Sequence, residues 1–132
     1  MPQNPYLVSA AALAYLGDCV IELCVREHLV GQGISSSLEL NKNALEFVRA
    51  KKQAEAMRNI LTLLSEDESD IFRRGRNIGH TNTPKSATVS EYRIATGMEA
   101  LFGYLHLLGK NERIKELFCA AYRTEEAAAQ FK

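Results

Sequence analysis

The stretch LAYLGDCVIEL, residues 13–23, reads as the middle of an apolar helix, yet it contains a glycine and an aspartate side by side, Gly17 and Asp18. Glycine costs a helix interior about 1 kcal/mol relative to alanine. A buried carboxylate costs more unless it is paired, hydrogen-bonded or bound to a metal ion. Apolar residues stand on both sides of the helical wheel around Asp18 and around Glu22, one turn further on. The pattern predicts a helix buried on both sides, inside the domain or against a partner chain, and a group that compensates Asp18.

Each polar or small residue of this stretch has two interpretations. Asp18 caps a neighbouring element or pairs with a core arginine, or it binds a metal ion. Glu22 forms an ion pair with Arg26 at the i+4 position, or it acts through a bound water and orients a ligand. Gly17 leaves room for a metal ion and a phosphate, or it allows a second backbone to pack closely.

A second apolar stretch, YRIATGMEALFGYLHLLG at residues 92–109, repeats the pattern with Glu99 among glycines. If the two helices cross, Asp18 and Glu99 meet, and two close carboxylates repel each other unless a cation lies between them. Magnesium favours such oxygen ligands and completes its shell with water and substrate phosphate. His106 lies on the face of Glu99, where a buried core histidine is the simpler interpretation than a ligand.

The rest of the chain also has helical patterns, and no alternating strand pattern persists. Ser65 and Glu68 have capping-box spacing at the start of one helix. Turn residues around Pro84 predict a loop over residues 78–89. We therefore expect an all-α fold, one compact domain over residues 1–132 with five to seven helices. The helices are expected near residues 9–30, 35–48, 48–64, 65–77, 90–108 and 111–123.

The composition is that of a globular protein, with 46% hydrophobic and 24% charged residues among 132. The 16 basic and 16 acidic residues cancel, so overall charge gives no support for a nucleic-acid partner. Three cysteines without C-x-x-C spacing indicate reduced thiols that serve as small core residues. The apolar run over residues 6–16 is shorter than the roughly 20 residues a membrane span needs, and no signal-peptide pattern precedes it. We expect a cytoplasmic protein without a membrane partner.

Five segments resemble one known family. LAYLGDCVIELCVREHL (13–29) is similar to the signature helix of the ribonuclease III catalytic domain, and MEALFGYLHL (98–107) is similar to its later glutamate-bearing helix. LNKNALEFVRAKKQAE (40–55) and FRRGRN with TPKSATVSEYR (72–77 and 83–93) resemble the short branch, Mini-ribonuclease III. That branch lacks a C-terminal double-stranded-RNA-binding domain, for which this chain has no room.

The resemblance implies an all-α homodimer that cleaves double-stranded RNA with Mg²⁺, for which Mn²⁺ can substitute. In bacteria the short branch trims the ends of the precursor of large-subunit (23S) ribosomal RNA, which makes a ribosomal protein or the assembling subunit a further candidate partner. By the same resemblance, Asp18 and Glu99 are the catalytic metal ligands. Glu22 and Thr96 are the candidates for orienting those ligands.

The sequence departs from the full-length family at two acidic positions, which are Ala14 and Thr96 here. This puts a second tightly held metal ion in doubt. Gly79-His80-Thr81 replaces the Lys-Ser-Gly often found in the central loop, so the choice of RNA can differ. His80 is expected to contact an RNA groove rather than to act as a catalyst.

Basic residues cluster around the central loop despite the zero net charge. Such a run is usually a solvated surface, but arginines and small polar donors also suit A-form RNA, which is recognised by shape. The acids at residues 66–70 can face away, and residues 42–58 form a second basic stretch. The resemblance favours RNA binding here, with Arg76 and Lys85 as the best phosphate contacts. The full candidate set is Arg73, Arg74, Arg76, Asn77, Thr83 and Lys85.

Two other functions fit a helical domain with paired acids. The first is a catalytically inactive adaptor of the same fold that binds RNA or protein, although retention of both Asp18 and Glu99 argues against it. The second is a helical metal-dependent nucleotide phosphohydrolase. Such a site usually carries several acids or histidines clustered in sequence, and this chain has no such cluster.

Overall fold

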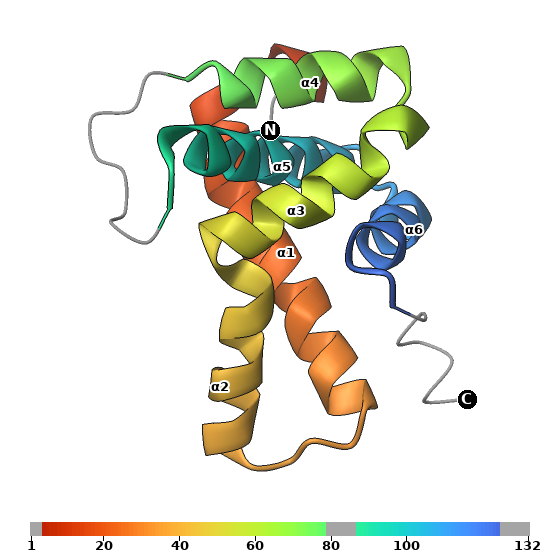
Figure 1. Cartoon of the computed structure of the whole chain (residues 1–132). Coiled ribbons are helices and arrows are strands. Elements are labelled where there is room, and N and C mark those ends of the chain that lie inside the picture. Colours follow the sequence, from red (N-terminus) through yellow and green to blue (C-terminus); the bar gives the residue numbers. More distant parts are fainter. Residues whose placement is uncertain (1–3, 79–86, 125–132) are drawn as a thin grey trace.

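The computed structural model describes residues 4–78 and 87–124 and is entirely helical there, as the sequence predicts. The described part contains six α-helices and two 3-10 helices (Figure 1). Most of the predicted loop, including His80, Thr83 and Lys85, lies outside the described residues. The elements are η1 (Pro5–Leu7), α1 (Ala10–Gly31), α2 (Ser37–Val48), α3 (Ala50–Ile60), η2 (Leu61–Leu63), α4 (Glu66–Arg76), α5 (Val89–Leu107) and α6 (Asn111–Tyr122).

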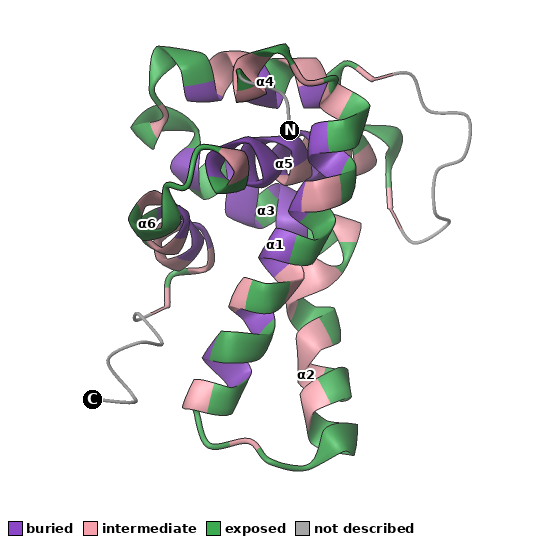
Figure 2. Ribbon diagram, turned by 180° about the vertical axis from the view of Figure 1, so that it is seen from behind, coloured by how far each residue is buried: buried purple, intermediate pink, exposed green. Residues whose placement is uncertain are grey.

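Helix α5 is the centre of the fold. Helices α1, α3 and α4 all pack against it, and α6 packs mainly on α3 (Figure 1). From Ala95 to Leu105 every residue of α5 is buried except Glu99, which is partly exposed (Figure 2). A helix that is apolar all round needs such cover on several sides. The acid that interrupts this buried run is therefore held close to the core.

Side-chain caps define where the helices begin. Ser9 accepts a hydrogen bond from the backbone N–H of Ala12, which starts α1. Ser65 and Glu68 form the predicted capping box at the start of α4. Thr88 forms a second capping box at the start of α5. Each cap satisfies backbone donors that the first helical turn leaves without partners. The predicted helix starts are confirmed to within two residues, whereas the third helix ends at Ile60 instead of near residue 64, because the 3-10 helix η2 follows it.

The lower half of α1 and all of α2 extend away from the core as an antiparallel pair (Figure 1). Aromatic rings join this pair to α6. The ring of Phe47 lies 5.5 Å from that of His28 and 5.1 Å from that of Tyr122, measured between centroids. Burial lowers the pKa of His28, so its imidazole is a neutral member of this cluster.

The interpretation of the cysteines as core residues is only partly right. All three are free thiols, and Cys24 and Cys119 are half-buried. Burial raises the pKa of the Cys24 thiol to about 12, which makes it unreactive. Cys19 is instead exposed on α1, because its side of the helix faces no other part of the described chain.

In residues 4–78 and 87–124, none of the helices combines the length and the apolar character that a bilayer span requires.

Candidate active site

Two glycines bring the backbones of α1 and α5 into direct contact. A Cβ atom built on Gly17 would lie 1.6 Å from the carbonyl oxygen of Glu99, and one built on Gly103 would lie 2.0 Å from the carbonyl oxygen of Leu13. No side chain fits at either position. Close packing is therefore what Gly17 provides, and Gly103, on the face of Glu99, is its counterpart. A glycine in each of two apolar, acid-bearing helices was the sequence signal for this contact.

The crossing brings the two predicted ligands together. The backbone of Glu99 on α5 makes the contact with Gly17 of α1, and Asp18 directly follows Gly17 in the sequence. Burial raises the pKa of Glu99 to about 8, and the negative charge of Asp18 and a carboxyl–carboxyl hydrogen bond with it add to the shift. The expected meeting of Asp18 and Glu99 is thus found in the structure.

The starting premise of a buried Asp18 is wrong for the single chain. Asp18 is exposed, and Glu99 is the carboxylate that the fold removes from water. Helix α1 is buried on one side only, through residues such as Leu13, Ile21 and Val25. Its other side carries exposed Tyr15 and Cys19, because no described element covers it.

The donor set fits a hard divalent cation. One carboxylate is largely desolvated and the other is open to solvent, so an ion between them would offset their repulsion and keep positions for water and phosphate. Among the described residues no group of three or more His, Cys, Asp or Glu side chains is arranged to hold a metal ion. A pair of carboxylates is a donor set that a hard divalent cation commonly accepts.

The neighbouring candidates have local partners. Glu22 forms an ion pair with Arg26 at 2.8 Å, which agrees with the simpler of its two interpretations. The hydroxyl of Thr96 is buried and donates to the backbone carbonyl of Tyr92 at 2.9 Å. His106 is exposed, so the interpretation as a core histidine is wrong: the end of α5 extends beyond the helices that cover its middle.

The three arginines of α4 have different surroundings. Arg73 lies 3.3 Å from Asp70 in an exposed ion pair. Arg74 donates to the backbone carbonyls of Tyr6 at 2.7 Å and Val8 at 2.8 Å, which fixes the N-terminal segment to α4. Because both of its terminal nitrogens are engaged, Arg74 is a structural residue in this arrangement. Sequence gave no signal for this role, since the carbonyls it binds are backbone groups distant in sequence.

Arg76 and Asn77 keep the features of an anion-binding pair. The guanidinium of Arg76 lies 5.7 Å from the ring centre of Phe72, and its Nε donates to Asn77 Oδ1 at 3.4 Å. Neither interaction neutralises its charge. The expectation that the acids at residues 66–70 face away from these basic residues holds only in part, because Asp70 pairs with Arg73.

Comparison with known proteins identifies relatives over most of the chain. A family model described as "Ribonuclease III domain" matches residues 11–110. A protein named Mini-ribonuclease 3 from Thermoanaerobacter sp. (strain X514) is 46% identical over 83% of this chain and 78% of the relative. A protein of the same name from Symbiobacterium thermophilum is 43% identical over 89% of this chain and 91% of the relative.

A solved structure has a similar fold. The crystal structure of a protein from Fusobacterium nucleatum superposes with a TM-score of 0.77 at 37% sequence identity. The match covers 85% of this chain and 89% of that one. The likeness therefore includes nearly all of the helical core that holds Asp18 and Glu99.

Proposed function

Because the chain belongs to the ribonuclease III domain family, we propose that it is a divalent-metal-dependent endoribonuclease that cleaves double-stranded RNA. The observation that carries this proposal is the pairing of Asp18 and Glu99 at the glycine crossing of α1 and α5. Both acids lie in the segments that resemble the metal-binding helices of the family. Residues 1–132 act here as one catalytic domain.

In this mechanism Asp18 and Glu99 would hold a Mg²⁺ ion, or Mn²⁺ in its place. Such an ion would lower the pKa of a coordinated water and stabilise charge on the phosphate. The protein positions the two carboxylates through a backbone contact that leaves no freedom of spacing. The exposure of Asp18 leaves one side of the pair open to a phosphodiester. No covalent nucleophile is required.

The RNA contacts are proposed on the surface near the end of α4. Arg76 and Asn77 are the best candidates in the described part, with Thr83 and Lys85 of the central loop beyond it. Guanidinium groups bind phosphate oxygens bidentately, and small polar donors reach the 2′-hydroxyls of A-form RNA. Arg73 contributes charge at the edge, whereas Arg74 holds the N-terminal segment.

The biological substrate that we propose is the precursor of large-subunit (23S) ribosomal RNA, whose ends the enzyme would mature in the cytoplasm. The support is the similarity to relatives named Mini-ribonuclease 3 together with what the resemblance implies for that branch. A ribosomal protein or the assembling subunit is the corresponding macromolecular partner.

We propose a homodimer formed through the uncovered side of α1. Tyr15 is 85% exposed and Leu23 is 59% exposed, and Cys19 lies between them at i+4 spacing. Large apolar side chains in such a row indicate an interaction surface. A two-fold axis beside this row would place two Asp18–Glu99 pairs in one dimer, one for each RNA strand.

The test is cleavage of a plain RNA duplex with Mg²⁺, beside nucleoside triphosphates as an alternative substrate. We expect duplex cleavage by the wild type, loss of more than about a hundredfold in kcat (~2.7 kcal/mol) in Asp18→Asn and Glu99→Gln, and RNA binding without metal by both variants. Glu27→Gln, an exposed change on the same helix, serves as the matched control. Duplex binding without cleavage by the wild type would identify an inactive adaptor, and hydrolysis of triphosphates alone would identify a phosphohydrolase.

A further inference from the structure

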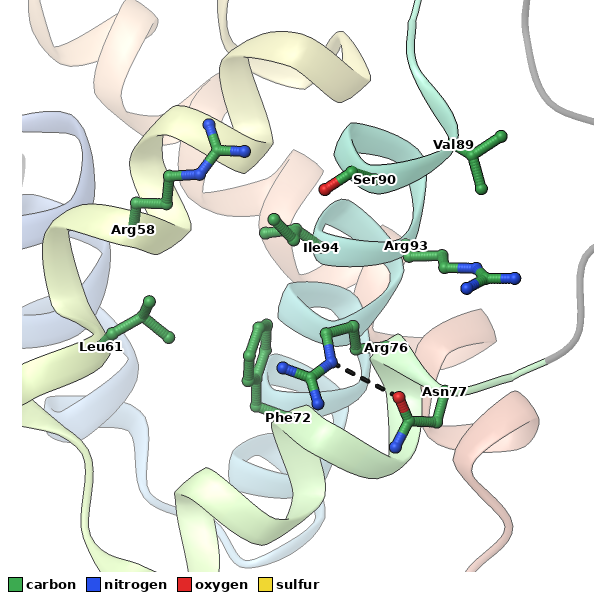
Figure 3. A pocket seen from close by; sticks show the side chains of 9 residues that line it. All are labelled: Arg58, Leu61, Phe72, Arg76, Asn77, Val89, Ser90, Arg93 and Ile94. Carbon is green, nitrogen blue, oxygen red and sulfur yellow. Dashed lines mark hydrogen bonds between the residues drawn. The ribbon is translucent and has the colours of Figure 1, made fainter.

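A cavity of about 630 Å³ opens where the ends of α3 and α4 meet the start of α5 (Figure 3). Arg58 of α3, Arg76 of α4 and Arg93 of α5 all line it, so three helices each contribute one arginine; in this view the guanidinium of Arg76 lies over Phe72 and that of Arg93 points toward the outer edge. Its apolar wall includes Phe72 and Ile94. We refer to this cavity as the three-arginine pocket.

The described part of the chain does not neutralise the positive charge of the pocket. Among its described lining residues there is no aspartate or glutamate. Within residues 4–78 and 87–124, Arg58 and Arg93 make neither an ion pair nor a hydrogen bond, and Arg76 donates only to the neutral Asn77. By contrast, Arg26 and Arg113 are each paired with a carboxylate. Three like charges around one concavity repel each other, and a bound anion would relieve that repulsion.

The pocket is separate from the carboxylate pair. A helix turns by about 100° per residue, which places Ile94 roughly 140° and Ser90 roughly 180° around α5 from Glu99. Both Ile94 and Ser90 line the pocket, whereas Glu99 faces α1. An anion bound in the pocket is therefore not the phosphate positioned for cleavage at Asp18 and Glu99.

We propose that the three-arginine pocket binds phosphate groups. A guanidinium presents parallel N–H donors that match two phosphate oxygens, and it loses less hydration than an ammonium does. The packing of Arg76 on Phe72 fixes one of the three forks beside the cavity. The cavity volume is in the range that accepts a small anionic ligand or a short piece of polynucleotide backbone.

Two sources can supply that phosphate. One is a segment of RNA outside the duplex that is cut, which would extend the footprint of Arg76 to Arg58 and Arg93. The other is a free phosphate compound such as pyrophosphate or a nucleotide. The RNA source rests on the proposed function, whereas phosphate binding itself does not.

The experiment follows the side-chain Nε–H resonances of the arginines by NMR without divalent metal, so that no RNA is cut. Inorganic phosphate, pyrophosphate and a short RNA duplex are titrated separately into the full chain. We expect saturable shifts for Arg58, Arg76 and Arg93 with at least one ligand, and none for Arg26 and Arg123. A free phosphate compound is the ligand if pyrophosphate displaces the duplex from these three residues, or if it saturates them and the duplex does not. Shifts by the duplex alone indicate RNA.

Variants separate charge from fold. The double variant Arg58→Gln/Arg93→Gln should lower the affinity for the ligand that binds by at least tenfold. The double variant Arg58→Lys/Arg93→Lys should keep most of the wild-type affinity. Lys115→Gln with Arg123→Gln, on and just after α6, removes the same charge elsewhere and should bind like the wild type. Equal affinity of the wild type and the Gln pair, or shifts no larger than at Arg26 and Arg123, would overturn the proposal. Cleavage of duplex RNA by the wild type is measured in parallel. It shows whether the proposed function holds even if the pocket binds no phosphate.

Discussion

Gly17 of α1 and Gly103 of α5 lie against each other at the helix crossing. A Cβ on Gly17 would come within 2.9 Å of the backbone nitrogen of Gly103, and a Cβ on Gly103 within 3.1 Å of that of Gly17. The atoms that would clash are backbone atoms, which cannot rotate away as a side chain does. The spacing of Asp18 and Glu99 is therefore fixed by the absence of two methyl groups.

We expect Gly17→Ala and Gly103→Ala each to push the two helices apart. Overpacking in a core costs about 1–3 kcal/mol, and the backbone contact here places both variants at the upper end. The kcat for cleavage should fall by more than the loss of folded protein explains, because the distance between the two carboxylates changes. Urea unfolding and kcat at a temperature where the variants remain folded measure the two effects. Glu27→Ala on the same helix should change stability by less than about 0.5 kcal/mol, and a Gly17→Ala variant equal to it would contradict the packing argument.

The uncovered side of α1 predicts a dimer that a single charge disrupts. Leu23→Glu should convert the protein to a monomer, because it places a carboxylate in an apolar interface. Light scattering at micromolar concentration gives the mass of both forms. Leu63→Glu alters an equally exposed leucine on η2 and should remain dimeric. A monomeric wild type would remove both the dimer and the model of one site per strand.

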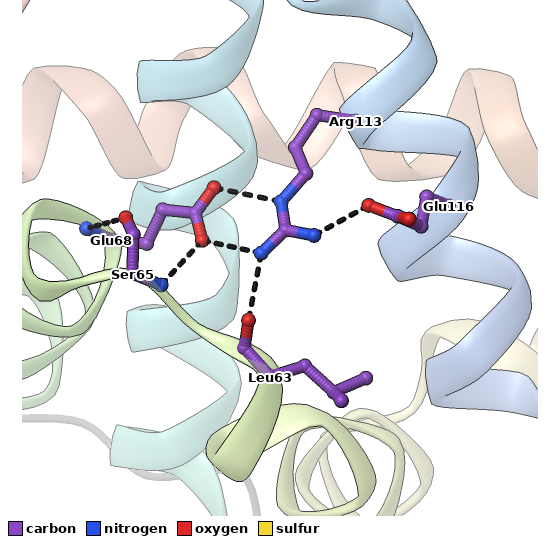
Figure 4. Close-up of polar contacts among 5 residues, drawn as sticks. All are labelled: Leu63, Ser65, Glu68, Arg113 and Glu116. Carbon is purple, nitrogen blue, oxygen red and sulfur yellow. Dashed lines mark hydrogen bonds and ion pairs between the residues drawn. The ribbon is translucent and has the colours of Figure 1, made fainter.

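Glu68 and Arg113 join α4 to α6 by a bidentate ion pair (Figure 4). Arg113 Nε donates to Glu68 Oε2 at 2.9 Å and Nη2 donates to Oε1 at 2.7 Å. Burial raises the pKa of Glu68, but the hydrogen bonds from Arg113 and from the backbone N–H of Ser65 outweigh it, so the pKa of this carboxyl is lowered overall. Arg113 also donates to the carbonyl of Leu63 at 2.8 Å.

This pair should make stability depend on pH in the acidic range. A carboxyl whose pKa is lowered in the folded state stabilises the protein at pH values above its unfolded-state pKa, 4.5. This stabilisation is lost as the pH falls through the folded-state pKa. Glu68→Gln mimics the protonated form, so it should cost about 2 kcal/mol at pH 7 and clearly less at pH 3, below the unfolded-state pKa. Urea unfolding at both pH values checks this. Glu22→Gln, which breaks the exposed pair with Arg26, should cost less than about 1 kcal/mol at either pH.

The sequence predicted the helices well because their signals are local. The capping box at Ser65 needs only four consecutive residues, and the apolar periodicity of α1 and α5 needs only one helix at a time. The similar box at Thr88 was not predicted, although its four residues are equally local. The meeting of Asp18 and Glu99 followed from the resemblance and from the symmetry of two glycine-bearing motifs. It could not follow from the spacing itself, because one sequence does not show which helices touch.

What the sequence could not predict depends on distant contacts. The exposure of Asp18 and His106 depends on which neighbours cover each helix face. Arg74 reads as one more basic residue of a run, yet it binds backbone carbonyls more than sixty positions away. The ion pair of Glu68 similarly depends on α6 lying next to the start of α4. In each case the sequence shows the residue but not the distant residues that cover it or pair with it.

Two arginines of α4 that are only two positions apart, Arg74 and Arg76, should respond differently to replacement. Arg74 donates to Tyr6 and Val8, its guanidinium lies 5.5 Å from the ring centre of Tyr6, and the Tyr6 hydroxyl donates to Asp70. Arg74→Ala should therefore cost about 1–2 kcal/mol of stability and release the N-terminal segment from α4. The described contacts of Arg76 are with Phe72 and Asn77, at the same end of α4, and it donates to no backbone carbonyl there, so Arg76→Ala should hardly move the thermal midpoint.

RNA binding should show the opposite order. If Arg76 and Lys85 contact phosphates, replacing both by alanine weakens duplex binding for all sequences and makes the slope of log affinity against log salt shallower by roughly one unit per contact. Arg74→Ala should keep the wild-type slope, because its charge is already engaged by the protein. The salt titration uses the Asp18→Asn background, which leaves the probe uncut, and a thermal scan of the same samples gives the stabilities. A wild-type slope in the double variant would show that the end of α4 is only a charged surface, and residues 42–58 would become the next region to test.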